Sequence, residues 1–189
     1  MMKARFLPPI ALISVLIPSG VSCSAAPPSD SGAFNPSGTK APQAAPAAPL
    51  PTAPTVTKAE ADKIVLDRYR LYQKTYEQAY ATGDPTPLAD VATDPLLTII
   101  TKDVTKTHNA GHIWRFRNLL NPKIQKRSSN LTKIAVIDCI RTLGAFRFSA
   151  KTGKRTGGTK KSTTFGYSVI FVYDGTTWNA SEAKKGKPC

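Results

Sequence analysis

The stretch that decides the fold is residues 57–83, TKAEADKIVLDRYRLYQKTYEQAYATG. Thr57 and Glu60 have the spacing of a capping box, which satisfies free backbone N–H groups at the start of a helix. Apolar and tyrosine residues then recur at intervals of three and four, the spacing of one helix face: Ala61, Val65, Tyr69, Tyr72, Tyr76, Ala79 and Tyr80. Gly83, followed by Asp84-Pro85, ends the pattern. The sequence therefore predicts a helix of about seven turns, whose tyrosine face packs in the core or, as the alternative, lines a ligand pocket.

Two shorter helices and several strands are expected after this helix. Residues 87–92 indicate a short helix, and a third helix should start after Thr93-Asp94-Pro95 and end at Gly111. Runs of β-branched and aromatic residues predict strands over 113–117, 132–140, 145–148, 164–173 and 177–179. The basic, glycine-containing residues 153–162 predict a turn between strands, and Asp174-Gly175 predicts a hairpin. Helices followed by antiparallel strands indicate an α+β domain with the helices packed on one face of the sheet.

Six short motifs carry a resemblance to a known family. They are Gly83-Asp84, Pro122-Lys123-Ile124, AVIDC at 135–139, Thr152-Gly153, YDGTTW at 173–178 and Cys189. In this order they resemble exported lipoproteins of Gram-positive, actinomycete-type bacteria that carry a nuclear transport factor 2-like (cystatin-like cone) domain. The resemblance covers about residues 57–189 and implies a curved antiparallel sheet wrapped round a long N-terminal helix. Most of these lipoproteins have no assigned activity, so the resemblance implies fold and location rather than chemistry. The chain departs from the family at Arg141 and in the basic stretch 151–161.

The first 22 residues have the layout of an export signal. Lys3 and Arg5 precede an apolar run that ends at Ile17, which is too short to span a membrane comfortably. Val21 and Ser22 stand before Cys23, as in the lipobox of bacterial lipoproteins, whereas Gly20 replaces the usual aliphatic residue. We therefore expect a lipoprotein signal peptide over 1–22 and lipidation of Cys23, with the protein held at the outer face of the cell membrane. Cleavage by an ordinary signal peptidase and free secretion is the alternative.

A proline- and alanine-rich segment separates this signal from the domain. Residues 23–56 contain few apolar side chains larger than alanine and only two charges, Asp30 and Lys40. Such a segment buries too little apolar surface to offset its conformational entropy. We expect a disordered, semi-rigid tether that lifts the domain of residues 57–189 off the membrane.

Cysteine usage agrees with export. Once Cys23 is lipidated or removed with the signal, Cys139 and Cys189 remain as an even pair. In an oxidising compartment such a pair predicts a disulfide. The alternative is a buried free thiol at Cys139.

The sequence offers little catalytic chemistry. His108 and His112 have a spacing that could hold a metal, but Gly111 should end the helix between them and no third ligand follows at a recognisable distance. Asp138 precedes Cys139 on a strand and must point to the opposite face. Inside the cone it could act as a general base beside Tyr69 and Tyr72; outside, it would be a polar position or pair with Arg141. We expect no cofactor, no bound metal and no enzymatic activity, with a small-molecule or catalytic pocket as the alternative.

The net positive charge of the chain comes entirely from its second half. The 189 residues carry a formal net charge of +14, and residues 101–189 hold 18 basic and only four acidic side chains. In the cytosol this charge would indicate a nucleic-acid binder, but export argues against nucleic acid. The expected partners are an anionic cell-wall polymer, a lipid or an exported protein, with a merely solubilising surface as the alternative. The predicted binding face consists of Arg115, Arg117, Lys126, Arg127, Lys151, Lys154, Arg155, Lys160 and Lys161.

Overall fold

The computed structural model describes residues 52–189. The predicted signal peptide, Cys23 and most of the predicted tether lie outside these described residues. Residues 52–57 run into the first helix without forming a helix or strand of their own. No helix within residues 52–189 is long and apolar enough to cross a membrane.

The helices begin and end close to where the sequence predicts them. Helix α1 spans Lys58–Thr82, the 3₁₀ helix η1 spans Thr86–Asp90, and α2 spans Leu96–Asn109. The predicted capping box is confirmed: the Thr57 hydroxyl accepts a hydrogen bond from the Glu60 N–H, and the Glu60 carboxylate accepts one from the Thr57 N–H. Reciprocal bonds of this kind fix where the helix starts.

Six antiparallel strands form one sheet. They are β1 (His112–Leu119), β2 (Lys123–Arg127), β3 (Lys133–Ser149), β4 (Arg155–Thr159), β5 (Thr163–Tyr173) and β6 (Trp178–Lys185). The path through the sheet is β1-β3-β5-β6, with β2 and β4 also paired to β3. β2 and β5 flank the first half of β3, whereas β1 and β4 flank its second half. The 17-residue β3 is therefore the strand on which the sheet is built.

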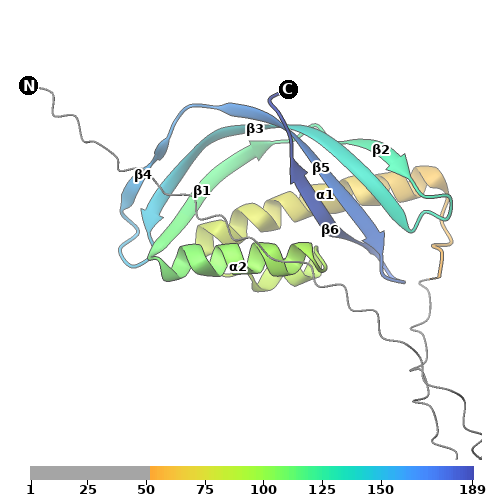
Figure 1. Ribbon diagram of the computed structural model, residues 1–189, viewed down its shortest axis with the longest axis horizontal. Coiled ribbons are helices and arrows are strands. Elements are labelled where there is room, and N and C mark those ends of the chain that lie inside the picture. The colour runs from red at the N-terminus through yellow and green to blue at the C-terminus, as the bar shows by residue number, and fades with distance from the viewer. Residues whose placement is uncertain (1–51) are drawn as a thin grey trace, which may run out of the picture. The chain divides into compact units, whose positions relative to one another are not determined.

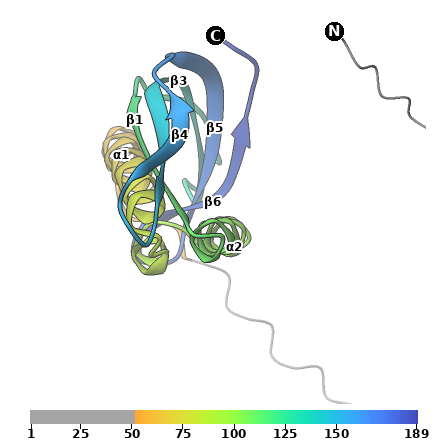
Figure 2. The same ribbon diagram turned by 90° about the vertical axis from the view of Figure 1, so that its left-hand side faces the viewer.

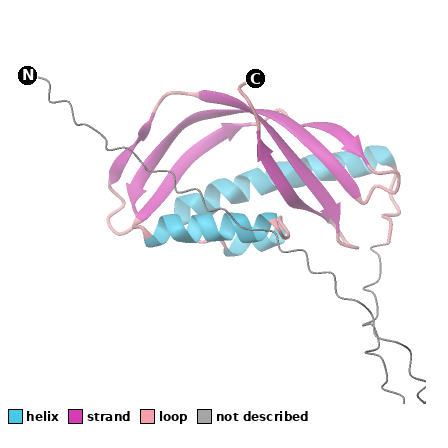
Figure 3. Ribbon diagram, in the orientation of Figure 1, coloured by secondary structure: helices cyan, strands magenta, loops and turns pink. Residues whose placement is uncertain are grey.

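The helices cover one face of this sheet. Figures 1 and 3 show the strands arching over α1 and α2, and Figure 2 shows both helices beneath the sheet when the domain is turned by 90°. The tyrosine face of α1 packs in the core, where Tyr69 and Tyr72 are fully buried against strand residues such as Val136 and Phe171. The predicted α+β class, with helices on a curved antiparallel sheet, is confirmed.

The strand predictions need four corrections. β2 and β4 were not predicted, and residues 155–159 form a strand where the sequence indicates a turn. β3 is one strand where two are predicted, and β6 runs to Lys185 instead of ending at residue 179. The sequences KIQKR and RTGGT have almost no apolar side chains. They form strands because the backbone of β3 supplies their hydrogen-bond partners, and side-chain pattern carries no signal of that.

An extra residue in β3 reverses which side chains face the helices. Between Thr142 and Ala145, β3 advances three positions while the partner strand β1 advances two, from Asn118 to Phe116. Such a bulge shifts the two-residue alternation of a strand by one position. Gly144 lies within it, at a φ of 131° that favours glycine. Before the bulge the even-numbered residues of β3 face the helices, and after it the odd-numbered residues do.

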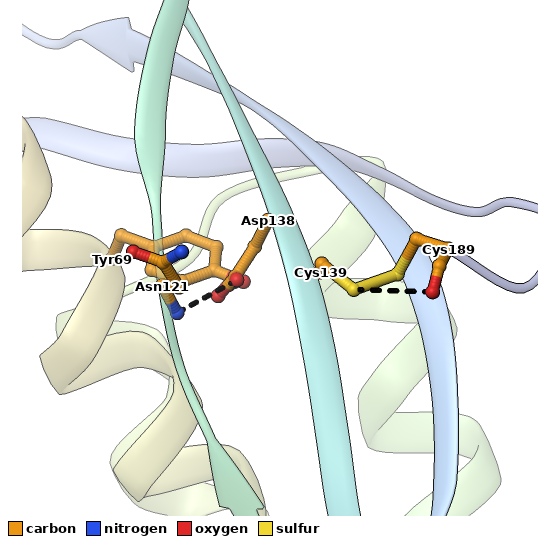
Figure 4. The surroundings of a disulfide bond; sticks show 5 residues. All are labelled: Tyr69, Asn121, Asp138, Cys139 and Cys189. Carbon is orange, nitrogen blue, oxygen red and sulfur yellow. Dashed lines mark hydrogen bonds between the residues drawn. A yellow bond between two sulfur atoms is a disulfide. The ribbon is translucent and has the colours of Figure 1, made fainter.

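The predicted disulfide is confirmed. Cys139 and Cys189 are bonded across a sequence separation of 50 residues, with their Cα atoms 6.1 Å apart. Cys139 alternates with the buried Asp138 and Ile140, so its side chain lies on the outer face of the sheet (Figure 4). The bond holds residues 186–189 against that outer face.

Close backbone packing beside the bulge makes Gly158 sensitive to substitution. A Cβ at Gly158 would lie 2.2 Å from the carbonyl oxygen of Ala145, whereas a Cβ at Gly175 would meet nothing within 4 Å. Both glycines have a positive φ, 100° and 105°. We expect Gly175→Ala to lower the free energy of unfolding by about 1–2 kcal/mol through backbone strain alone. Gly158→Ala should cost several kcal/mol more, because β4 must move away from β3.

Urea unfolding of the two single variants measures this difference. Since the two φ values are nearly equal, Gly175→Ala is the matched control for strain. Equal losses in both variants would show that the contact between β4 and the bulge does not constrain the sheet.

Candidate functional site

Asp138 lies inside the domain, in contact with α1. Its side chain is buried, with only 6% of its surface exposed. The Tyr69 hydroxyl donates to Asp138 Oδ2 at 2.9 Å, and the Asn121 backbone N–H donates to Oδ1 at 2.8 Å (Figure 4). The interpretation of Asp138 as an outer polar residue paired with Arg141 is therefore wrong. Asn121 lies in the gap between β1 and β2, where its N–H has no strand partner, and the carboxylate fills that role.

A chain of polar contacts extends from this carboxylate. Gln73 donates from Nε2 to the Tyr69 hydroxyl at 3.4 Å and accepts at Oε1 from Asn118 Nδ2 at 3.3 Å. The Thr142 hydroxyl in turn donates to Asn118 Oδ1 at 2.8 Å. These contacts join α1 to β1 and β3. Because both Asp138 oxygens already accept hydrogen bonds, the carboxylate is held as a structural acceptor.

Buried tyrosines complete this network. The Tyr72 and Tyr167 hydroxyls lie 3.1 Å apart, linking α1 to β5. Burial raises the pKa of Tyr69 far above the usual value for tyrosine, and the nearby Asp138 raises it further. Burial raises the pKa of Tyr72 in the same way, and there the nearby Tyr167 adds to the increase. Burial also raises the pKa of Tyr167 to about 12. All three tyrosines therefore stay protonated at neutral pH.

A pocket of about 380 Å³ opens beside this network on the helix-facing side of the sheet. Four of its eleven lining residues are aromatic, so we call it the aromatic pocket: Tyr76, Phe116, Phe165 and Tyr167. The Lys185 ammonium lies 4.3 Å from the centre of the Phe165 ring, within the range of a cation–π contact. Asp138 does not line this pocket. The candidate base is therefore not part of this pocket's wall.

The histidines stand on different elements. His108 belongs to the last turn of α2, whereas His112 starts β1 after Gly111. Within residues 52–189 no group of three His, Cys, Asp or Glu side chains could hold a metal ion.

Seven of the nine predicted basic residues gather on one half of the sheet. Arg115 and Arg117 lie on β1, and Arg155 lies on β4, both strands that flank the second half of β3. The other four stand at the two ends of β4 and are Lys151, Lys154, Lys160 and Lys161. All seven side chains are exposed.

The remaining two residues of the predicted face lie apart from this group. Lys126 and Arg127 are on β2, at the opposite end of β3. Arg127 forms an ion pair with Asp62 of α1, and its hydrogen bond to that carboxylate raises the pKa of the guanidinium. Its charge is therefore already neutralised by a local partner.

Two phenylalanines on β3 organise the basic half of the sheet. The guanidinium carbon of Arg115 lies 4.5 Å from the centre of the Phe148 ring, and that of Arg155 lies 4.2 Å from the Phe146 ring. We call these four residues the arginine–phenylalanine surface. A ring beneath each guanidinium restricts its position and leaves its other face open to a ligand. Sequence reasoning missed both phenylalanines as site residues, because the bulge that turns them outward leaves no apolar or polar pattern.

Acidic side chains are absent from this surface. Residues 104–137 and 139–173 contain no Asp or Glu, so β1, β2, β4 and β5 carry no carboxylate. The single acidic residue of β3, Asp138, faces the helices. In the part of the chain that the structure describes, neither Arg115 nor Arg155 forms an ion pair.

The fold is similar to that of solved structures with little sequence identity. No protein-family model and no curated protein matches the chain. The intermembrane space region of the chloroplast protein ARC6 is 16% identical over 71% of this chain and 99% of that one, with a TM-score of 0.56. A candidate scytalone dehydratase from Novosphingobium aromaticivorans is 12% identical over 69% and 89%, with a TM-score of 0.47.

An uncharacterised protein with a cystatin-like fold from Caulobacter vibrioides is 8% identical over 66% of this chain and 89% of that one, with a TM-score of 0.42. At such identities, similarity shows the fold alone. Two helices packed against a curved antiparallel sheet give this domain a nuclear transport factor 2-like fold. The resemblance to exported lipoproteins in particular stays a prediction.

The buried tyrosines make stability depend on alkaline pH. Tyrosine in the unfolded chain loses its proton near pH 10, whereas the raised pKa values of Tyr69, Tyr72 and Tyr167 keep these residues protonated in the folded state. Above pH 10 the folded state binds more protons than the unfolded state, so the free energy of unfolding falls as pH rises. The fall is up to about 1.4 kcal/mol per pH unit for each such tyrosine. Urea unfolding between pH 8 and pH 11.5 measures it, and Tyr72→Phe should make the slope shallower. An unchanged slope in Tyr72→Phe would refute the assignment.

Proposed function

We propose that this protein is an exported, lipid-anchored and non-enzymatic binding protein whose arginine–phenylalanine surface recognises an anionic cell-wall polymer. In this proposal Cys23 carries the lipid, and residues 23–56 hold the domain away from the membrane. The domain then presents Arg115 and Arg155 to a polymer that bears phosphate or carboxylate groups.

The observation that carries the proposal is the stacking of both guanidinium groups on Phe146 and Phe148, with no carboxylate nearby in sequence. An arginine that serves only solubility has no need of a fixed position. A guanidinium held over a ring loses less side-chain entropy when it binds, and its planar N–H groups match phosphate and carboxylate in a two-bond geometry. The surrounding lysines raise the local concentration of anions.

Export is supported by two independent features. The Cys139–Cys189 disulfide is of the kind that persists in oxidising compartments and is rare in the cytosol. The N-terminal sequence has the basic start, the short apolar run and the cysteine of a lipoprotein signal. The family resemblance points in the same direction.

The non-enzymatic part rests on Asp138. Both of its oxygens accept hydrogen bonds from Tyr69 and Asn121, and it does not line the aromatic pocket. A general base must lie within hydrogen-bond reach of its substrate. Asp138 is better described as the acceptor that ties α1 to the gap between β1 and β2.

Lipidation is tested by metabolic labelling with a fatty acid. We expect the exported full chain to become labelled and to partition with membranes, because acylation at Cys23 supplies the anchor. Cys23→Ala should abolish both the label and the membrane association. Label that persists in Cys23→Ala would show that the lipid, if any, is attached elsewhere.

Polymer binding is tested with inorganic polyphosphate as the simplest polyanionic probe. We expect Arg115→Ala/Arg155→Ala to weaken binding of the full chain by at least about 100-fold at low salt, since each of the two lost groups contributes about 1.5–3 kcal/mol and every ~1.4 kcal/mol is tenfold in affinity. The matched control is Arg70→Ala/Arg127→Ala, which removes the same charge from arginines that are paired with Asp67 and Asp62. The control should bind almost as well as the original protein.

Two results would contradict the proposal. Equal weakening in both double variants would show that net charge alone attracts the polymer. Tighter binding of the Cys23→Ala chain, which lacks the lipid anchor, to vesicles of an anionic phospholipid than to polyphosphate or purified cell wall would point to the membrane as the partner. Binding should also weaken as salt is added, because exposed charges are screened.

A further inference from the structure

A hollow on the outer face of the sheet lies beside the disulfide. Its volume is about 420 Å³, within the range of about 300–1,000 Å³ that small-molecule sites occupy. Strands β2, β3, β5 and β6 contribute to its lining, together with Gly186 and Cys189. It shares no residue with the arginine–phenylalanine surface.

One row of paired residues forms the floor of this hollow. Lys123 is the cross-strand partner of Ile137, Ile137 is the partner of Ser168, and Ser168 is the partner of Lys184. Directly paired residues of antiparallel strands point to the same face. Ile137 is two positions from Cys139, so this face is the outer one. The row thus presents a 38% exposed isoleucine and a hydroxyl between two lysines.

Residues 186–189 form a wall that is fixed at two points. The Gly166 N–H donates to the Lys187 carbonyl at 2.8 Å, and the Gly186 N–H donates to the Gly166 carbonyl at 2.7 Å. The second point is the disulfide between Cys189 and Cys139. A wall held in this way pays little ordering entropy when a ligand arrives.

The two lysines beside the floor are unpaired. In residues 52–189 neither Lys123 nor Lys184 forms an ion pair. The single acidic residue of β6, Glu182, lies in the next cross-strand row, opposite Ile170. The oxygens of Asp138, which also borders the hollow, are already engaged by Tyr69 and Asn121.

We propose that this hollow binds a single-chain fatty carboxylate. The acyl chain would cover Ile137, and the carboxylate would lie near Ser168, within reach of Lys123 and Lys184. An exposed isoleucine bordered by two cations complements one apolar chain with one anionic head. A polyphosphate would leave Ile137 uncovered, and an uncharged lipid would leave both lysines unpaired. This ligand is separate from the polymer proposed above, so either proposal can fail alone.

Calorimetric titration of the full chain with laurate, below its micelle concentration, tests the site. We expect Lys123→Ala/Lys184→Ala to raise the Kd at least tenfold, and Ser168→Leu, which fills the floor, to abolish measurable binding. Lys151→Ala/Lys154→Ala is the matched control, because it removes the same charge from the turn between β3 and β4. The control should bind laurate as the original protein does. Every variant shares residues 1–51, so differences among them report on the domain.

Two further probes separate the chain from the head group. Acetate has the head without the chain, and dodecyltrimethylammonium has the same chain length with a positive head; neither should bind. Thermal unfolding by circular dichroism checks that the exposed-lysine variants remain folded. The proposal is overturned if laurate does not bind, if the lysine variant and its control bind equally, or if the cationic amphiphile binds as well as laurate.

Discussion

The two-residue alternation of β3 is the constraint on which the rest of this structure depends. Along one strand it sends Asp138 toward the helices and Ile137 and Cys139 toward solvent. The extra residue near Gly144 then shifts the alternation, so that Phe146 and Phe148 also face outward. Without that bulge the two rings would lie on the helix side. The arginines of β1 and β4 would then have no aromatic platform.

Buried polar contacts in the interior of the domain hold α1 in place. The Asp138 carboxylate joins α1 to the gap between β1 and β2, and Gln73 and Asn118 continue the contacts along the helix. A buried carboxylate is costly unless its oxygens accept hydrogen bonds. Here both do, which explains how an acidic residue is tolerated in the core.

The outer face of the sheet, in contrast, is covered by no helix of residues 52–189 and presents two distinct chemistries. One half combines guanidinium groups with aromatic rings. The other half combines an apolar floor with two lysines and is bounded by the segment that the disulfide holds. The disulfide therefore does more than stabilise the fold, because it also shapes one wall of a candidate binding site.

The sequence by itself determined the elements with strong local patterns. The capping box at Thr57, the tyrosine face of α1, the apolar strand β5 and the pairing of the two cysteines could all be predicted from spacing and composition. Only the tertiary structure decided that KIQKR and RTGGT are strands, that Asp138 is an internal acceptor, and that Arg115 and Arg155 rest on phenylalanines. These features depend on backbone pairing with β3 and on one inserted residue. Neither leaves a periodic signature in the side chains, because pairing uses backbone groups that every residue shares.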